Sequence, residues 1–452
     1  MGPDRPRSDM PAAKRFKHKK PLTVFLIVTT MVYTVQRQLP DRPALTPPPY
    51  RHPPYLCPQA DPGTEKVPLV DVNGKHTLLI SAYLDRRKTI REVRIIAVAL
   101  RSEQAAYRCH LCCQGQRHNT TGNAYVHKDH FGFDYGTMDI FCLLPAECPD
   151  PSHVAVSVVG APAEKELRYL EVQNREPISD DFPHDFTICI STMFDFSNVL
   201  QLIQSMEMLR LLGVTKVVVY KTSCNAHTQK VLDYYESTGF MDVIAWPLSS
   251  RLNVSRGWQP ADSPGQLHYF GQIAALNDCM YRYMYLSRYI GLHDIDEIII
   301  PQKVDSWKDL MPLLEQAHGV DRGYMFENFV FPTSISWAPP TQASHLGKGW
   351  PQVEGVNILH HLYYEPLDTQ SFHNFKILVN PRAVRITSVH GLLDSAHGCE
   401  QVPNNVARMY HTRDPITTGL KPEELTFDGH LLDYRDRLVP AVNAVLEKSE
   451  LL

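Results

Sequence analysis

The 452-residue chain carries almost no net charge: 45 Lys and Arg residues face 49 Asp and Glu residues, which gives −4 at pH 7. It also lacks a basic stripe. Proteins that bind DNA or RNA gather basic side chains on one face, because phosphate contacts supply much of the affinity. The sequence therefore argues against nucleic acid as a partner.

Zinc-finger spacing is also missing. The 21 histidines are scattered, and Cys109-x-x-Cys112-Cys113 is not followed by a second Cys-x-x-Cys pair. Disulfides in an oxidising compartment are the better interpretation of an even set of cysteines. The ten cysteines are Cys57, Cys109, Cys112, Cys113, Cys142, Cys148, Cys189, Cys224, Cys279 and Cys399.

The apolar run near the N-terminus is short. Residues 22–35 carry no charge, but 14 helical residues span only about 21 Å, less than the ~20-residue length of a usual membrane helix. No small-x-small cleavage site follows, and five basic residues precede the run, Lys14, Arg15, Lys17, Lys19 and Lys20. We interpret residues 1–20 as a cytosolic tail and 21–36 as a transmembrane signal anchor. A cleaved signal peptide and an interior helix are the alternatives.

The chain beyond this run fits a luminal, single-pass type II protein. Residues 37–68 are rich in proline, which predicts an extended stem. Asn119-Thr120-Thr121 and Asn253-Val254-Ser255 are N-glycosylation sequons.

Residues 69–175 and 180–452 differ in pattern. The first segment has short alternating runs and no long helical period, which predicts a small β-sandwich. The second alternates strands with helices, beginning with buried strands at 186–191 and 216–220 and a helix at about 197–212. This order predicts an α/β domain with parallel strands, whose ligands bind at the carboxyl ends of the strands.

A pair of carboxylates stands where one of these strands ends. Asp294 and Asp296 lie in His293-Asp294-Ile295-Asp296-Glu297, after a hydrophobic run. Side chains two apart on a strand share a face. Two oxygen donors on one face suit Mg²⁺ or Mn²⁺, which often complete their coordination with substrate phosphates. A nucleotide-sugar diphosphate is the substrate that this arrangement suits best.

Several motifs together resemble glycosyltransferase family 92, a family with the GT-A type of Rossmann-like nucleotide-sugar transferase domain. They are the segments 271–279 (GQIAALNDC), 293–297 (HDIDE), 376–381 (KILVNP), 389–390 and 410–411. The resemblance covers about residues 185–415. The overall arrangement is most similar to that of a vertebrate member, with an avian one among the candidates.

The resemblance implies an inverting, Mn²⁺-dependent β-1,4-galactosyltransferase of the Golgi membrane. UDP-galactose would be the donor, and terminal galactose or fucose of a glycoprotein or glycolipid glycan the acceptor. Plant relatives carry an N-terminal carbohydrate-binding-like β module, which is similar in position to residues 69–175. A non-catalytic glycan-binding protein that retains the GT-A fold is the alternative, and a glycoside hydrolase is a weaker one.

The resemblance also implies roles for single residues. Asp296 and Asp294 would hold the metal, with His390 as a third ligand and His411 as the alternative. Glu297 would fix the loop, with a role as a direct metal ligand as the alternative. The nucleotide would meet residues of the first strands and of the helix before the acidic motif: Ser191, Thr192, Lys221, Gln272, Asn277 and Asp294, with Lys376 at the diphosphate. For Asp278 on that helix two interpretations stay open, an ordinary ion pair with Arg282 four residues later or a role in holding the sugar.

An inverting transfer also needs a base that removes the proton of the acceptor hydroxyl. Glu327 and Glu365 are the preferred candidates, and Glu354 and Asp394 remain open because spacing does not choose among them. Trp337 and Trp350 flank a polar loop and could stack on sugar faces or pack in the protein.

Overall fold

The computed structural model describes residues 57, 67–87, 91–161, 167–179, 181–335, 350–367, 374–417 and 419–452. All of them belong to one compact unit, Pro54–Leu452. The predicted tail and anchor, residues 1–36, and nearly all of the stem lie outside these stretches. Within them, no helix is both long and apolar enough to cross a lipid bilayer.

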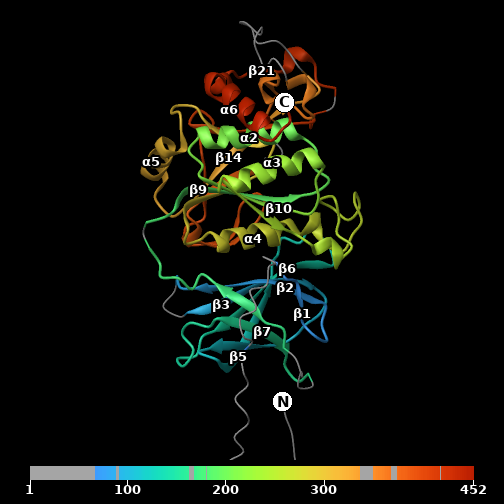
Figure 1. Ribbon diagram of the computed structural model, residues 1–452, viewed down its shortest axis with the longest axis vertical. Helices are drawn as coiled ribbons and strands as arrows, with labels where there is room; N and C mark the ends of the chain where they lie inside the picture. Colours follow the sequence, from blue (N-terminus) through green and yellow to red (C-terminus); the bar gives the residue numbers. More distant parts are fainter. Residues whose placement is uncertain are drawn as a thin grey trace, which may run out of the picture. The chain divides into compact units, whose positions relative to one another are not determined.

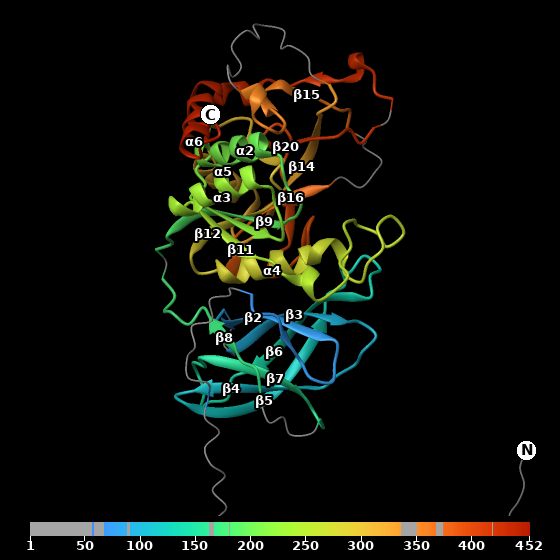
Figure 2. The same ribbon diagram turned by 45° about the vertical axis from the view of Figure 1, so that its right-hand side comes forward.

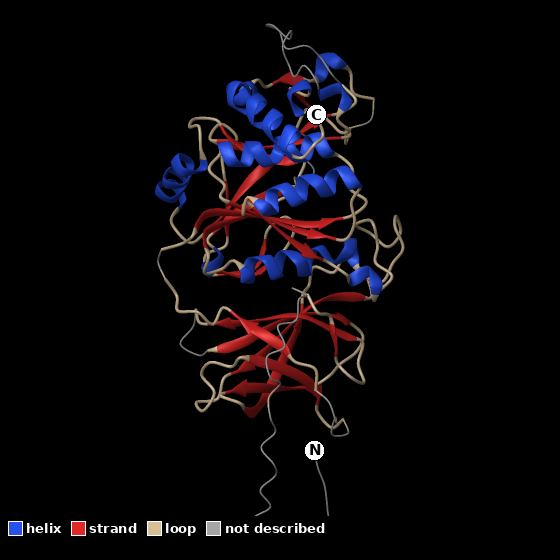
Figure 3. Ribbon diagram, in the orientation of Figure 1, coloured by secondary structure: helices blue, strands red, loops and turns tan. Residues whose placement is uncertain are grey.

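Among the described residues, eight strands form the sheet of the N-terminal domain, which is drawn in blue to green in Figure 1 and as red strands in Figure 3. They are β1 (Val70–Asp71), β2 (Thr77–Asp85), β3 (Glu92–Leu100), β4 (Tyr107–Cys113), β5 (Gln116–Val126), β6 (Tyr135–Leu143), β7 (His153–Val158) and β8 (Leu170–Gln173). Their order in the sheet is β1-β2-β3-β6-β5-β4-β7-β8, and β8 also pairs with β2, with Ala82 opposite Val172. Strands β2 to β8 therefore form a closed barrel.

The predicted β-sandwich is thus wrong in architecture, although the strands themselves were expected. Alternation and turn residues mark strands, but they do not tell whether the last strand pairs with an early one. Closure removes exposed strand edges. Three of the disulfides, Cys57–Cys112, Cys109–Cys142 and Cys113–Cys148, tie this domain together. Their pairing confirms the disulfide interpretation of the Cys109 to Cys113 cluster over a zinc site.

The second domain is built around a mixed sheet. Its main elements are β9 (His184–Met193), α2 (Val199–Leu211), β10 (Lys216–Lys221), α3 (Ala226–Ser237), β11 (Met241–Ala245), α4 (Gln272–Arg282), β12 (Ser287–Leu292), β13 (Glu297–Pro301), α5 (Trp307–His318), β14 (Gly323–Pro332), β16 (Phe375–Val379), β20 (Ala407–Arg413) and α6 (Arg435–Lys448). Shorter strands are β15 (Tyr363–Tyr364), β17 (Val384–Thr387), β18 (Leu392–Ser395), β19 (Cys399–Gln401) and β21 (Thr426–Phe427).

The strand order is β11-β10-β9-β12-β16-β14-β20-β13, with β19 paired to β14. Strands β9 to β12 are mutually parallel, as the alternation of strands and helices predicted. Residues along β9 are buried on both faces, as in other parallel strands that helices cover. The fourth disulfide, Cys189–Cys279, joins β9 to α4.

Helices cover both faces of this sheet. Figures 1 and 2 show α2 and α3 on one face, whereas α4 lies on the other face, between the sheet and the barrel. Apolar side chains of α4, such as Ile273 and Met280, share a buried cluster with Ile80 and Ile96 of the barrel. Leu79 of β2 packs instead inside the barrel. Both faces of β2 and β3 are therefore buried.

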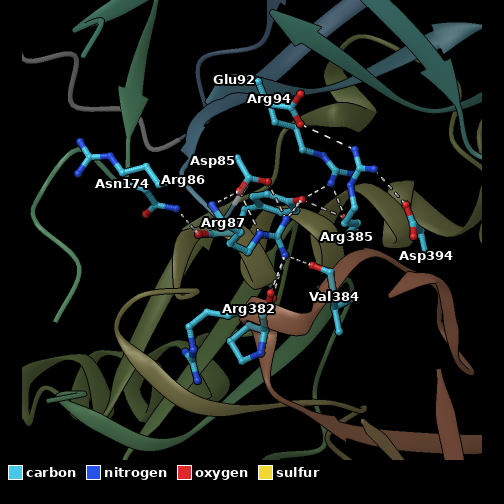
Figure 4. A network of polar contacts seen from close by, with 12 residues as sticks. Asp85, Arg86, Arg87, Glu92, Arg94, Asn174, Arg382, Val384, Arg385 and Asp394 are labelled. Atoms are coloured by element: carbon cyan, nitrogen blue, oxygen red, sulfur yellow. Dashed lines mark hydrogen bonds and ion pairs between the residues drawn. The ribbon is translucent and has the colours of Figure 1, made fainter. Parts of the chain in front are cut away.

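Polar contacts also join the barrel to the second domain (Figure 4). Arg87 donates to the hydroxyl of Tyr281 at 2.6 Å and to the carbonyl of Pro381 at 3.2 Å. Arg94 is fully buried, donates to Asp139 at 2.9 Å, and also contacts the Tyr281 hydroxyl. These guanidinium groups hold Tyr281, on α4, from the barrel side.

Candidate active site

A cavity of about 990 Å³ opens where β9 and β12 end. This is the edge at which ligands bind in open α/β sheets. Its walls come from several elements: residues 190–194 and Phe196 at the end of β9 and just after it, the acidic motif 294–297, Lys376 of β16, and residues 411–414 at the end of β20 and just after it. Phe131 of the barrel also lines it.

The acidic motif stands at this edge. Both Asp294 and Asp296 line the cavity, and their side chains are 35% and 36% exposed. Glu297 begins β13 and is buried. Its Oε2 accepts a hydrogen bond from the backbone N–H of Asp294 at 2.8 Å. Glu297 therefore holds the turn that presents the two aspartates.

A buried lysine lies between two of these carboxylates. Nζ of Lys376 is 2.9 Å from Oδ2 of Asp294 and 3.1 Å from Oε2 of Glu297. Burial alone would lower the pKa of Lys376, but the two carboxylates raise it above its ordinary value. Lys376 is therefore a fixed positive charge in the cavity wall.

His411 contacts Asp296, as Lys376 contacts Asp294. Antiparallel pairing of β13 with β20 sets His411 opposite Glu297. Nε2 of His411 lies 3.2 Å from Oδ2 of Asp296, and Nδ1 lies 3.2 Å from Oδ1 of Asn328. Burial would lower the pKa of His411, but Glu297 and Asp296 together raise it.

The structure does not gather Asp294, Asp296 and His390 into a three-ligand metal site. Within the described stretches, no group of three or more His, Cys, Asp and Glu side chains is placed to hold a metal ion. His390 instead stacks on Trp258, with ring centroids 5.3 Å apart, and its Nδ1 lies 3.1 Å from the carbonyl of Phe375.

The two aspartates nevertheless suit a divalent cation. Each binds its basic partner through Oδ2, and Oδ1 of each has no hydrogen-bond partner among the described residues. Two partly exposed carboxylate oxygens on one cavity wall are the donors expected for Mg²⁺ or Mn²⁺ that takes its other ligands from water and phosphate.

Unsatisfied polar groups mark the end of the cavity near β9. Gln272 donates from Nε2 to Oγ of Ser191 at 2.9 Å. Oε1 of Gln272 and Oγ1 of Thr192 are buried without a hydrogen-bond partner. Such groups are rare in folded proteins and suggest that a ligand supplies their partners. Ser191, Thr192 and Gln272, three of the residues predicted to contact the nucleotide, thus lie together in the cavity.

Other predicted nucleotide contacts lie elsewhere. Lys221 donates to Oε1 of Gln229 at 2.6 Å and does not line the cavity. Asn277 is fully buried and bonds the backbone of Thr387 through both its amide nitrogen and its oxygen. It therefore joins α4 to β17.

Asp278 is held by partners from the barrel, from the sheet of the second domain and from α4 itself. It accepts hydrogen bonds from the hydroxyls of Tyr83, at 2.6 Å, and Tyr220, at 2.5 Å. The ion pair with Arg282, one of the two roles predicted for Asp278, is present at 3.1 Å, and Asp278 does not line the cavity.

Neither preferred base lines the cavity. Glu365 accepts hydrogen bonds from the backbone N–H groups of Ile416 and Thr417, so it anchors that turn. Glu327 is buried in β14, opposite Phe375 of β16. Glu365 thus makes structural contacts, and Glu327 is enclosed in the sheet away from the cavity lining.

The remaining candidates also lie away from it. Glu354 accepts a hydrogen bond from Asn225, and Asp394 pairs with Arg385 at 3.5 Å. Trp350 is buried and donates to Asn443, while Trp337 lies outside the described residues.

A carboxylate that sequence reasoning missed does line the cavity. Asp414 follows β20, three residues after His411, and its Oδ1 accepts a hydrogen bond from the hydroxyl of Thr333 at 2.8 Å. The signal that could have found it is its position at the end of the strand that carries the His411 motif.

Fold and cavity together define a class. An α/β domain whose strand ends open into a cavity lined by paired carboxylates, a buried lysine and unsatisfied polar groups has the architecture of an enzyme domain with its site at the strand ends.

The family is shown by comparison with known proteins. The model of glycosyltransferase family 92 matches residues 184–437, more than half of the chain, and the protein belongs to this family. It is therefore a member of a transferase family.

Among curated relatives, the beta-1,4-galactosyltransferase galt-1 of Caenorhabditis elegans is 20% identical over 250 residues, 53% of this chain and 55% of that protein. A glycosyltransferase family 92 protein of the same organism is 26% identical over 137 residues, 30% of this chain and 26% of that protein. The chain thus spans little more than half of the length of one relative and about a quarter of the other.

A solved structure of glucosyl-3-phosphoglycerate synthase from Mycobacterium tuberculosis, in complex with Mn²⁺, UDP and glucosyl-3-phosphoglycerate, is 10% identical. The alignment covers 60% of this chain and 81% of that chain with a TM-score of 0.24. A similarity this low carries no conclusion about the site.

Proposed function

We propose that the protein is an inverting glycosyltransferase that moves galactose from UDP-galactose, in β-1,4 linkage, to terminal galactose or fucose of a glycan. The observation that carries this proposal is the pair Asp294 and Asp296. Both side chains line the cavity and are partly exposed, beside the fixed charge of Lys376. Membership of family 92 and the similarity to a galactosyltransferase support the choice of donor and linkage.

In this proposal Asp294 and Asp296 would hold a Mn²⁺ ion at the cavity wall, where the diphosphate of the donor would lie. A bound Mn²⁺ supplies positive charge that stabilises the UDP leaving group. Lys376 adds a second, permanent positive charge on the same wall. Ser191, Thr192 and Gln272 then bind the nucleoside, which satisfies the orphaned oxygens of Thr192 and Gln272.

Asp414 replaces Glu327 and Glu365 as the proposed base, because it is the cavity carboxylate outside the acidic motif. The acceptor hydroxyl gives its proton to Asp414 while its oxygen attacks the anomeric carbon of galactose. The bond from that carbon to the β-phosphate oxygen breaks, and UDP leaves. The Thr333 hydroxyl, 2.8 Å from Asp414, orients the carboxylate.

The ion pairs of the two aspartates support one alternative function, that of a non-catalytic glycan-binding protein. Because Asp294 and Asp296 each contact a basic side chain, a family member that binds glycans without a metal or UDP would show the same pairs. In that protein Lys376 and His411 would substitute for the cation.

One experiment separates the two candidates. A secreted form that begins before Cys57 is incubated with UDP-galactose and a β-galactoside, with Mn²⁺ or with EDTA, and UDP release is measured. We expect release that needs Mn²⁺ and that Asp296→Ala abolishes. Metal-independent glycan binding, with no turnover of any UDP-sugar, would instead identify a glycan-binding protein.

We also propose a Golgi membrane location, with residues 1–20 cytosolic and the two domains luminal. Four disulfides support an oxidising compartment, and Asn119 and Asn253 of the sequons are both exposed. Sensitivity of the expressed protein to endoglycosidases, together with protease protection of intact vesicles, tests this topology.

A further inference from the structure

The barrel reaches into the cavity through the segment between β5 and β6. This segment, residues 127–134, carries Phe131 to the cavity wall. It is fastened on both sides: Asp129 accepts a hydrogen bond from Ser388, and the carbonyl of Phe133 accepts one from Arg101. Ser388 lies two residues before His390, so the segment is anchored next to the cavity.

Phe131 is part of a group of aromatic rings that we call the aromatic wall: Phe131, Trp258, Tyr269 and His390, all of which line the cavity. Phe131 meets Trp258 edge-on at 5.3 Å, and Trp258 stacks on His390 at 5.3 Å with an interplanar angle of 18°. Edge-on and stacked ring contacts of this kind hold aromatic side chains in fixed orientations.

A buried histidine supports the wall from behind. His268 stacks on Phe131 at 4.2 Å, and neither of its ring nitrogens has a hydrogen-bond partner. Burial, with a smaller contribution from His390, lowers its pKa to about 3, so the ring is neutral at physiological pH. His268 therefore acts as an apolar ring beneath Phe131.

The backbone of the wall is strained. Tyr269 and Phe270 both have positive φ angles, 32° and 53°, before Gly271 at 77°. Residues with side chains rarely adopt this conformation, and such strain concentrates at binding and catalytic sites. Trp246 holds the segment by donating to the carbonyl of Phe270 at 2.7 Å.

The wall borders the acidic motif. Tyr269 has its pKa raised to about 12, first by burial and then by the nearby charges of Asp294 and Asp296. Burial lowers the pKa of His390, and the charge of Lys376 lowers it further. Tyr269 and His390 line the same cavity as the acidic motif, and Nδ1 of His390 lies 3.1 Å from the carbonyl of Phe375, the residue before Lys376. The rings therefore border the charged groups, where the transferred sugar would lie in the proposed function.

We propose that the aromatic wall is a stacking platform for a hexopyranose ring and that the barrel completes it with Phe131. This rests on the proposed function. A galactopyranose presents C–H groups on one face, which pack against aromatic rings, while its hydroxyls bind polar groups. Arg413, Asp414 and Asn374 supply such groups in the same cavity. The ring is either the donor galactose or the terminal sugar of the acceptor.

The test measures three constants for each variant: KM for UDP-galactose, KM for the glycan acceptor and the inhibition constant of UDP. For Phe131→Ala we expect at least one of the two KM values to rise about tenfold, because ring stacking is lost. The constant for UDP, which has no hexose, should stay within about twofold. The KM that rises tells whether the stacked sugar is the donor galactose or the terminal sugar of the acceptor.

Two further variants separate stacking from packing. Phe131→Leu keeps an apolar side chain but has no ring face, so it should resemble Phe131→Ala, whereas Phe131→Tyr should resemble the wild type. Tyr125→Ala is the matched control, since Tyr125 is an exposed aromatic residue on β5 that does not line the cavity. Thermal melting of each variant checks that it is folded.

Three results would overturn the platform: unchanged KM values in Phe131→Ala, wild-type KM values in Phe131→Leu, or a rise in the UDP constant equal to that in KM. The last would assign the rings to the nucleobase. If the wild type turns over no UDP-sugar, the proposed function fails separately. Calorimetric titration of β-galactosides and UDP into the wild type and Phe131→Ala then still tests the platform.

Discussion

The ammonium of Lys376 lies 3.1 Å from the buried carboxylate of Glu297, and both side chains are only 3% exposed. A pair of this kind is costly to break by removing one partner, because the other charge stays buried without compensation. The same lysine reaches Asp294 at the cavity surface. The stability of the second domain and the charge of the cavity thus depend on one side chain.

We therefore expect Lys376→Met to lower the free energy of unfolding by about 3–5 kcal/mol. Lys221→Met is the control, because Lys221 has a partly exposed side chain and one hydrogen bond to Gln229; it should lose about 1 kcal/mol or less. Urea denaturation followed by tryptophan fluorescence measures both. Equal losses in the two variants would contradict a role for the buried pair.

Replacing the proposed base should affect turnover and leave donor binding intact. We expect Asp414→Asn to lower kcat for transfer by about 10²- to 10⁴-fold, with KM for UDP-galactose nearly unchanged. Glu354→Gln is the control, since Glu354 is a carboxylate that does not line the cavity. A wild-type kcat in Asp414→Asn, or an equal fall of kcat in Glu354→Gln, would show that Asp414 is not the base.

The two aspartates should control the metal requirement. Asp294→Asn and Asp296→Asn are expected to raise the Mn²⁺ concentration needed for half-maximal activity by at least about tenfold, because each removes a charged oxygen donor. Their unfolding midpoints should move little, since both side chains are about one-third exposed. Titration of activity with MnCl₂ after EDTA treatment gives the comparison. An unchanged Mn²⁺ requirement in both variants would remove the aspartates from the metal site.

His268 makes stability depend on pH. Its pKa is about 3 in the folded protein against an ordinary 6.5, so between these values the unfolded chain binds a proton that the folded chain does not. The contribution of neutral His268 to the free energy of unfolding is therefore fully present above pH 6.5. It is lost as the pH falls toward 3, with a slope of at most about 1.4 kcal/mol per pH unit.

The variant His268→Phe keeps a ring beneath Phe131 and removes this titration. As the pH falls from 7 to 4.5, the unfolding free energy of the wild type should therefore decrease more than that of the variant. The difference between the two should change steadily over this range. Guanidinium denaturation at several pH values measures it. A difference that is constant over this range would show that His268 does not titrate as proposed.

The order of strands and helices was readable from the sequence because it depends on local patterns. Buried runs such as residues 186–191 and 216–220 became β9 and β10, and the acidic motif falls at a strand end, as expected. The ion pair of Asp278 with Arg282 follows from helical spacing alone.

The features that the sequence could not provide depend on contacts between distant segments. The pairing of β8 with β2 decides between a barrel and a sandwich, and neither strand signals it. Glu365 looked suited to a sugar pocket from its aromatic neighbours, but the backbone of residues 416 and 417 engages both of its oxygens. Phe131 belongs to another domain in the linear order, so no local pattern connects it with the cavity.

The contacts of Arg87 and Arg94 with Tyr281 have a consequence for the expression of the second domain without the barrel. The family match begins at residue 184, after the barrel ends, and a fragment cut there would expose the apolar underside of α4 to water and strip Asp278 of its Tyr83 hydroxyl. Such a fragment should precipitate, whereas one that retains the barrel should stay in solution.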